Sequence, residues 1–471
     1  MLGLRTSRVG FGVFVSSLAA ALALGCSDDP QGTSSSSGGG EGTGAGTQTA
    51  GVTFHKDVEP ILQESCLSCH RAGQIGGFSL EQYASAKALS AQIVAKTEAG
   101  EMPPFLARET AECDETRPWR NDLRLSPEKL ATLKAWHEAG APEGDPADAP
   151  PPYVAPELGL PDRDAAIAPV TPSTVEGETD QFTCVIYDPA LAADTYVDGL
   201  HFVPQNAKVA HHALVFRTSR SDALSQSGGE ERYPCFGGPP GDLVHGWVPG
   251  SQPLELPEGV GIPVGPDDVF VIQMHYHPTG TTVETDASTL ELRYRDAMPL
   301  YAYQVVLIGA PGVMDVLLPG PNDQGGPEFR IPANATGHTE EILWSVPNLG
   351  LPEVKMLSIA NHMHYVGVDQ RVWVDRANAG GEECLLHTPA WDFNWQMFYQ
   401  WDVPLDELPV TRPGDIWNIR CEYDNSMGNP FVAKALDEQG LAAPQDVVLG
   451  EQTLDEMCLV GLGILVPAAL L

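Results

Sequence analysis

Hydrophobic and polar residues follow a helical period in the first third of the chain. Between residues 52 and 148 the apolar residues recur every three or four positions, as in helices that bury one face. Two such stripes are Tyr83, Ala86, Leu89 and Ile93, and Leu130, Leu133 and Trp136. The second stripe begins after Ser126-Pro127, a helix-start signal, and ends at Gly140. The pattern predicts a small all-α domain.

After Pro172 the period changes to that of strands. Short β-branched and aromatic runs bounded by Pro, Gly, Asn or Asp occur at residues 213–216, 269–274, 301–307 and 371–374. About 300 residues of this texture predict two antiparallel all-β sandwiches. Composition places the boundaries, which we predict as a signal peptide (1–25), a Ser/Gly-rich tether (26–51), the helical domain (52–148), a Pro-rich linker (149–175) and two β domains (176–300 and 301–471).

The N-terminus has the features of an export signal. Arg5 and Arg8 precede an apolar run that ends at Leu24, too short to span a bilayer comfortably. The segment up to Cys26 resembles the lipobox of bacterial lipoproteins, except that the usual leucine is Ala23. The resemblance implies lipidation of Cys26, attachment to a membrane by this lipid alone, and a periplasmic, outer-membrane or cell-surface location.

Charge and cysteine content narrow the function classes further. With 26 Lys and Arg against 63 Asp and Glu, the formal charge of −37 repels phosphate backbones, so we expect no nucleic-acid partner. Export implies an oxidising compartment in which thiols pair or carry cofactors. Six cysteines outside the motifs discussed here are expected in disulfides whose pairing the sequence leaves open: Cys113, Cys184, Cys235, Cys384, Cys421 and Cys458.

The helical region carries a C-x-x-C-H motif, Cys66-Leu-Ser-Cys69-His70. Two thiols at this spacing can bind the two vinyl groups of one haem, and the adjacent His70 then supplies an axial imidazole. The region from 52 to 146 resembles class I cytochromes c. That resemblance implies a sixth ligand from a later loop, for which Met102 is the candidate, with His55 and His137 as the alternatives.

Three histidine motifs lie in the β-rich part: His211-His212, His275-Tyr-His277 and His362-Met-His364. Strand residues two apart project to the same side, so His362 and His364 can bind one ion, as can His275 and His277. Adjacent residues point to opposite faces, so His211 and His212 can serve one metal only at a bulge or a strand end. Three histidines can also hold zinc, which is the alternative metal.

Four stretches resemble copper type II monooxygenases, the family of dopamine beta-monooxygenase and peptidylglycine alpha-hydroxylating monooxygenase. They are residues 209–216, 271–278, 361–364 and 455–459, in the family's order. The resemblance implies jelly-roll-like sandwiches with two mononuclear copper sites, an electron-transfer site at His211, His212 and His275 and an oxygen-reacting site at His362, His364 and Met457. It further implies a structural role for His277 and a Cys421–Cys458 disulfide.

Other methionines and histidines have blander expected roles. Met427 lies in a Gly/Asn-rich loop and is a weaker rival to Met457. Four histidines match no motif and are expected to be surface or hydrogen-bonded residues: His201, His245, His338 and His387.

Together these features predict an enzyme that uses dioxygen to hydroxylate a C–H bond of a small organic substrate. The fused haem or an external reductant such as ascorbate is the expected electron source. Ala360, Leu459 and Gly461 replace polar or basic residues of the peptide-amidating branch, which disfavours a peptide glycine and favours a neutral or cationic small molecule. The alternatives are a non-catalytic haem–copper electron carrier or redox sensor, and a copper-scavenging or adhesion lipoprotein.

Overall fold

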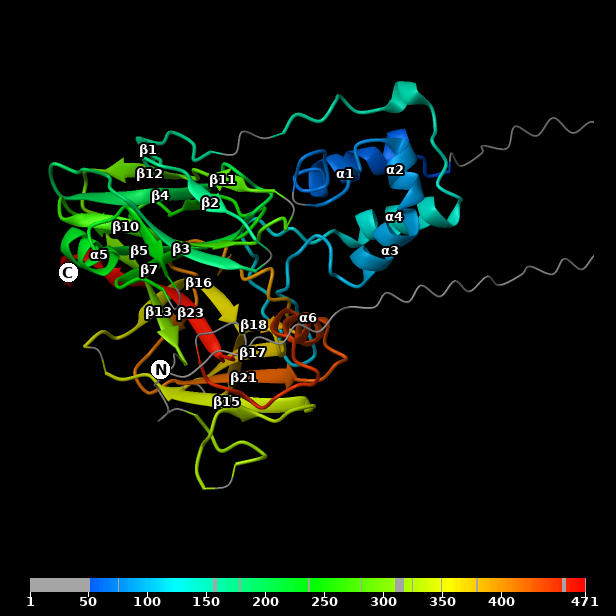
Figure 1. Ribbon diagram of the computed structural model, residues 1–471. Coiled ribbons are helices and arrows are strands. Elements are labelled where there is room, and N and C mark those ends of the chain that lie inside the picture. The colour runs from blue at the N-terminus through cyan, green and yellow to red at the C-terminus, as the bar shows by residue number, and fades with distance from the viewer. Residues whose placement is uncertain are drawn as a thin grey trace, which may run out of the picture. The chain divides into compact units, whose positions relative to one another are not determined.

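A computed structural model describes residues 51–74, 76–155, 159–177, 179–235, 238–280, 282–309, 317–323, 325–348, 350–377, 380–450 and 455–470. The predicted signal peptide, the tether up to residue 50 and the lipidation site Cys26 lie outside these residues. The described chain is mostly β-sheet with six α-helices (Figure 1). None of its helices is long and apolar enough to cross a membrane.

The helices fall where the apolar stripes predict them. Their bounds are α1 (Glu59–Ser65), α2 (Tyr83–Ala88), α3 (Ser90–Glu98), α4 (Pro127–Glu138), α5 (Arg220–Ser227) and α6 (Pro430–Gln439), with shorter turns at Phe54–Val58, Pro146–Asp148 and Ala468–Leu470. The Ser126 side chain caps α4 by accepting from the Lys129 N–H at 3.3 Å. Ala86, Ile93, Leu133 and Trp136 meet in one small buried cluster, so α2, α3 and α4 share a local core.

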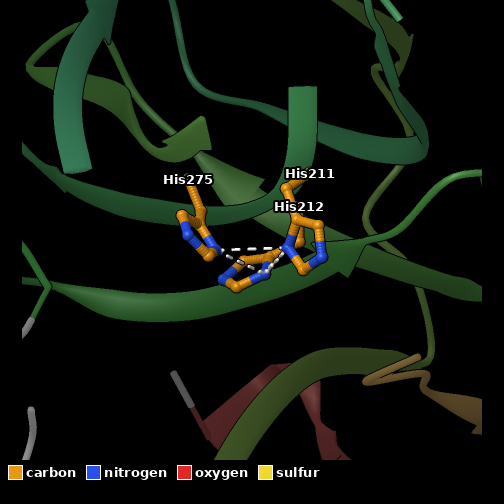
Figure 2. Close-up of side chains that lie close together, drawn as sticks. All are labelled: His211, His212 and His275. Atoms are coloured by element: carbon orange, nitrogen blue, oxygen red, sulfur yellow. Dashed lines mark hydrogen bonds between the residues drawn. The ribbon is translucent and has the colours of Figure 1, made fainter. Parts of the chain in front are cut away.

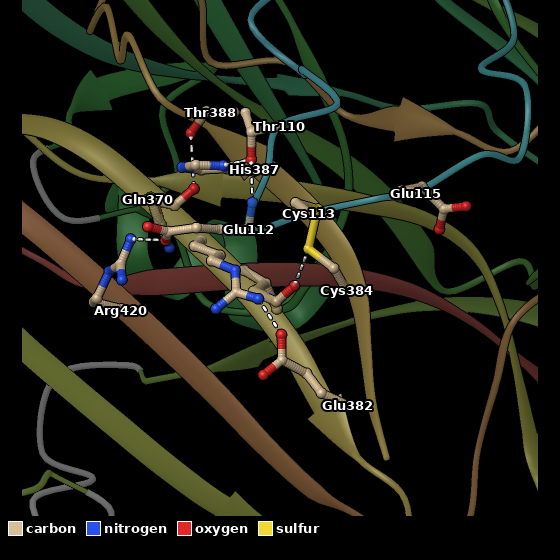
Figure 3. Close-up of a disulfide and its surroundings, with 12 residues drawn as sticks. Thr110, Glu112, Cys113, Glu115, Gln370, Glu382, Cys384, His387, Thr388 and Arg420 are labelled. Atoms are coloured by element: carbon tan, nitrogen blue, oxygen red, sulfur yellow. Dashed lines mark hydrogen bonds and ion pairs between the residues drawn. A yellow bond between two sulfur atoms is a disulfide. The ribbon is translucent and has the colours of Figure 1, made fainter.

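Residues 105–121 depart from the predicted helical domain. This segment is extended, and Phe105 and Trp119 belong to the buried core of the β-rich part. The Arg108 N–H donates to the His387 carbonyl at 2.9 Å, and Cys113 forms a disulfide with Cys384 (Figure 3). The helical period cannot predict this docking, because it depends on a partner about 270 residues away in the sequence.

The largest sheet has the strand order β1-β12-β4-β9-β13-β23-β16-β19, with β8 on β4 and β20 on β16. Its strands are β1 (Ala165–Ile167), β4 (Thr195–Val203), β8 (Leu254–Glu255), β9 (Val260–Val264), β12 (Thr289–Arg295), β13 (Tyr301–Ile308), β16 (Val354–His362), β19 (Tyr399–Gln400), β20 (Val410–Thr411) and β23 (Leu459–Pro467). A five-stranded sheet follows the order β6-β3-β10-β5-β7. Its strands are β3 (Gln181–Tyr187), β5 (Ala210–Ser219), β6 (Arg232–Pro234), β7 (Asp242–Trp247) and β10 (Asp268–Tyr276).

A four-stranded sheet follows the order β15-β21-β17-β18. Its strands are β15 (Thr336–Ser345), β17 (Gly367–Asp375), β18 (Glu382–Thr388) and β21 (Ile416–Asp424). Two small pairs complete the β structure: β2 (Ser173–Val175) with β11 (Glu284–Asp286), and β14 (Arg330–Ile331) with β22 (Val447–Val448). The four predicted strand runs lie in β5, β10, β13 and β17.

The sheets pack in a manner compatible with two β-sandwiches. Phe202 on β4 contacts Trp247 on β7 with ring centroids 5.0 Å apart, which joins the first half of the large sheet to the five-stranded sheet. The Gln370 side chain on β17 donates to the Leu459 carbonyl on β23 at 2.7 Å, which joins its second half to the four-stranded sheet. The two halves are themselves continuous, because β9 pairs with β13 in parallel. This parallel pair corrects the purely antiparallel prediction.

Three disulfides join cysteines of the described chain, and they indicate an oxidising compartment. They pair Cys113 with Cys384, Cys184 with Cys235, and Cys421 with Cys458, as the family resemblance implied for the last pair.

We expect the Cys113–Cys384 disulfide to stabilise the chain most. It joins residues 271 apart, against 51 for Cys184–Cys235, so it removes more entropy from the unfolded chain. The loop-entropy difference between the two is about 1.5 kcal/mol. Thermal unfolding of the two double serine variants measures this, with the lower midpoint expected for C113S/C384S. A lower midpoint for C184S/C235S would contradict the entropic argument.

Candidate metal centre

Three histidine rings converge where β5 pairs with β10. His275 lies opposite His212, but Tyr276 lies opposite Ala210, so His211 is the extra residue of a β-bulge. The bulge turns both adjacent imidazoles toward His275, which is the condition that the sequence set for a shared ion (Figure 2). The three Nδ1 atoms are 3.2, 3.2 and 3.3 Å apart.

This arrangement fits a metal ion. The centre of such a triangle lies about 1.9 Å from each corner, close to the roughly 2.0–2.1 Å of a metal–imidazole bond. Burial, followed by the charge of His275, lowers the pKa of His211 to about 4, and burial holds the pKa of His212 well below its usual value. The rings are therefore neutral at pH 7, which is the form that binds metals.

Neighbouring polar groups fix the outer nitrogens of these rings. His211 Nε2 lies 2.9 Å from Asn394 Oδ1, and His275 Nε2 lies 2.9 Å from Asp180 Oδ2. The other Asp180 oxygen is 2.7 Å from His277 Nδ1, so His277 is a neighbour of Asp180 with a half-exposed side chain. Burial raises the pKa of Asp180, but its contacts with His275 and His277 outweigh burial and lower it, so Asp180 is a carboxylate. Such outer partners orient metal-binding imidazoles.

The second set of predicted ligands lies at the end of β16. His362 and His364 have ring centroids 5.1 Å apart and perpendicular ring planes. His362 pairs with Leu459 on β23, so the chain two residues before Leu459 brings the Met457 backbone alongside His364. Nδ1 of His362 contacts Gln396 Oε1 at 2.6 Å, and Nδ1 of His364 contacts the Asp455 carbonyl at 3.0 Å. Both rings therefore present Nε2 as the ligand atom.

Glu456 holds the Met457 segment against His364. Its carboxyl group is fully buried and accepts from the backbone N–H groups of His364, Val366 and Met457. Burial raises the pKa of Glu456 to about 8, against the opposite effect of these hydrogen bonds. The Cys421–Cys458 disulfide and a 3.0 Å hydrogen bond from the Tyr423 hydroxyl to the Met457 carbonyl restrain the same segment. Met457 is thus a buried residue on a firmly held backbone, whereas the rival Met427 is exposed.

One short segment contacts both histidine sets. Asn394 binds His211 and Gln396 binds His362. Between the two sets, the Phe393 ring lies 6.4 Å from the His212 ring and 6.2 Å from the His364 ring. Residues 393–396, which we call the bridging segment, therefore hold one imidazole of each set.

We expect Asn394→Ala and Gln396→Ala to act on different sites. Each removes the oxygen that orients one imidazole, and loss of such a partner lowers metal affinity about 10- to 100-fold. Competition with a chelator should show weaker binding at the first histidine set in N394A and at the second in Q396A. Trp395→Phe, which alters the same segment without touching a histidine oxygen, is the control. Equal weakening of both sites in both single variants would show that the segment acts only as a scaffold.

The predicted haem ligands lie in the helical region, apart from the histidine sets. Cys66 and Cys69 form no disulfide, unlike the other cysteines of the described chain. A turn after α1 presents both thiols, because the N–H groups of Cys69 and His70 donate to the Cys66 carbonyl at 3.2 and 2.9 Å. The His70 ring stacks on Phe78, and its buried Nδ1 has no hydrogen-bond partner. The free thiols and the open imidazole nitrogen fit covalent haem attachment.

The candidate sixth ligands differ in their contacts. His55 Nδ1 is 2.7 Å from a Glu59 oxygen, and His137 Nδ1 is 2.9 Å from the Ser90 hydroxyl. Both rings therefore have a partner in the helical core. Met102 is partly buried in the turn after α3. These contacts leave Met102 as the candidate without a competing polar role.

The prediction for the remaining histidines was wrong in two cases. His338 and His387 are hydrogen-bonded, to Glu340 and to Asp369 respectively. His201 and His245 are buried, and each has one ring nitrogen without a partner. The sequence has no signal for either, since an isolated histidine carries no periodic context.

No protein-family model matches this chain. Two peptidyl-glycine alpha-amidating monooxygenases of Xenopus laevis, B and A, are 29% and 30% identical to it over 112 residues. The match covers 22% of this chain and only 12% and 11% of those proteins. The major capsid protein P2 of bacteriophage PM2 matches with a TM-score of 0.25 and 7% identity, covering 64% of this chain and 96% of that one. The sequence matches indicate that this chain has a copper-monooxygenase-like region.

Proposed function

We propose that this chain is an exported copper-dependent monooxygenase that hydroxylates a C–H bond of a small organic molecule. The convergence of three Nδ1 atoms at a β-bulge supports it most directly, and the partial similarity to amidating monooxygenases supports the reaction class. Copper bound at two sites supplies the two electrons that, with two protons, convert dioxygen and a C–H bond to an alcohol and water. Imidazoles accept both copper oxidation states, and the Met457 thioether favours Cu(I).

The chain's own residues orient the ligands and restrict water. Asp180 and Asn394 fix His275 and His211, while Gln396 and Glu456 fix His362 and the Met457 segment. His275 is 1% exposed and its ring stacks on Phe182 with centroids 4.3 Å apart, so the first site is closed to bulk water on that side. A rigid, dry ligand shell lowers the reorganisation that accompanies each electron transfer.

The substrate that we propose is a neutral or cationic small molecule. Ala360, two residues before His362 on the same side of β16, offers no charge for a carboxylate. Gly461 pairs with Ala360 on β23, so this face has no side chain that binds an anion. The acidic chain, with a formal charge of −37, favours cations over anions as well.

We further propose that a c-type haem on Cys66 and Cys69 supplies electrons to the first site. A Cβ atom built on Gly250 would lie 3.7 Å from Cys69 Sγ, so this loop contacts the haem motif. Gly250 lies three residues after Trp247, which pairs with Ala213, the neighbour of His212. The covalent and hydrogen-bonded path from the haem motif to the first histidine set is therefore short.

Metal and haem content together with rapid kinetics test both proposals. Purified full-length protein is expected to hold two coppers and one haem. After anaerobic reduction and mixing with oxygen, haem oxidation should keep pace with copper reduction. Haem that stays ferrous while copper cycles would reject the electron-supply proposal. Zinc in place of copper would reject the monooxygenase, and copper without oxygen consumption would favour the electron-carrier alternative.

A further inference from the structure

A cavity outside both histidine sets lies beside His245. It has an empty volume of ≈ 690 Å³, which is within the range of small-molecule sites. Four parts of the chain line it: the docked segment 105–123, the end of β7 with its following loop, the facing strands β13 and β16, and residues 397–400. None of its lining residues is a candidate copper or haem ligand.

His245 gives this cavity an unused hydrogen-bonding group. The residue is on β7, is 8% exposed, and its Nε2 atom has no hydrogen-bond partner among the described residues. A buried polar atom without a partner destabilises the folded chain, so such atoms are uncommon unless a ligand or water completes them. Burial, followed by the charge of nearby His201, lowers the pKa of His245 to about 3, so the ring is neutral at pH 7.

The rest of the lining indicates the chemistry of the occupant. Phe105, Met397 and Phe398 supply apolar walls, and the Phe398 ring centroid is 6.4 Å from that of His245. The Tyr303 and Ser358 hydroxyls, both buried, are 3.2 Å apart and can each donate or accept.

The cation in the lining already has a partner. The Arg120 guanidinium donates to the Glu255 carbonyl at 3.3 Å and lies 3.8 Å from its carboxylate. Apolar walls, hydroxyls, a neutral imidazole and a neutralised arginine suit an uncharged ligand with an aromatic body and a hydroxyl group.

We propose that this cavity is a binding site for a small, neutral, hydroxyl-bearing aromatic molecule whose hydroxyl group hydrogen-bonds to His245 Nε2. The site does not depend on copper or haem, and it goes beyond the proposed oxygen chemistry. Its position connects the two regions, however. Ser358 lies four residues before His362, and alternation along β16 puts both on the same face. The loop containing Gly250, which lines the cavity, also contacts Cys69.

Phenol is the probe for this site, with toluene and benzoate as the ligands that lack the hydroxyl group or carry a charge. Calorimetry on the full chain should show that phenol binds and that toluene and benzoate bind at least about 10-fold more weakly, since sites that hydrogen-bond a hydroxyl discriminate strongly against analogues without one. Tighter binding of benzoate, or no binding of phenol at 10-millimolar concentration (about the weakest binding calorimetry detects), would overturn the proposal.

Variants of His245 separate a ligand-binding role from a structural one. H245F should weaken phenol binding about 10-fold or more, whereas H245Q, which keeps a polar group, should retain most of it. The thermal midpoint of H245F should be equal or higher, because the variant removes an unpartnered buried nitrogen. Should H245F fail to fold, Y303F removes one hydroxyl with little change of shape and should also weaken binding several-fold. Unchanged phenol affinity in the folded variants would overturn the proposal.

Discussion

Replacing His275 with alanine is expected to remove one of two coppers and to stop turnover. His275 supplies one corner of the Nδ1 triangle, and the other two corners come from adjacent residues on a bulge. Two imidazoles without the third leave an open shell, so affinity should fall by more than about 100-fold, beyond the effect of losing an outer partner. Copper per chain, measured after dialysis against a chelator, should drop from two to one.

His277→Ala is the matched control for that experiment. His277 is two residues further along the chain and contacts the same Asp180, but its side chain is half exposed and it faces no other histidine of the set. Its loss should leave both coppers bound. If H275A retained two coppers, or if H277A lost one, the assignment of the first site would be wrong.

Replacing Met457 with leucine is expected to weaken Cu(I) at the second site and to abolish oxygen-dependent turnover. The side chain is 7% exposed, so leucine preserves the packing while it removes the sulfur. A thioether stabilises Cu(I) in particular, so the Cu(I) affinity of that site should fall about 10- to 100-fold. X-ray absorption of the reduced protein should lose its copper–sulfur signal, while the first site stays loaded.

Met427→Leu controls for the loss of a methionine as such. Met427 is 57% exposed and contacts neither histidine set in the described chain, so its replacement should leave the copper–sulfur signal unchanged. A signal that persists in M457L but disappears in M427L would move the ligand to the loop before α6. Persistence in both variants would remove the case for thioether ligation.

Local chemistry of the candidate sites could be predicted from the sequence. Alternation along a strand placed His362 and His364 on one side, and the geometry of adjacent residues required a bulge at His211 and His212. The structure has that bulge, with Ala210 rather than His211 opposite Tyr276. The helices between residues 83 and 138 follow their apolar stripes in the same way.

The partners of these residues were beyond sequence reasoning. Asp180 reaches His275 from 95 residues away, and Asn394 reaches His211 from 183 residues away. An isolated Asp or Asn in a loop has no periodic signal, because its role depends on which strands pair. The bridging segment 393–396 is therefore a finding of the structure alone.

The sequence by itself determined which side chains can bind metal or haem and which local elements carry them, because ligand chemistry and strand or helix period are properties of neighbouring residues. Only the tertiary structure decided that three imidazoles meet within 3.3 Å, that residues 105–121 leave the helical region to dock on the β-sheets, and that a parallel pairing of β9 with β13 joins the two β regions. These outcomes depend on contacts between residues far apart in the chain, which are set by the packing of the whole core and not by any local pattern.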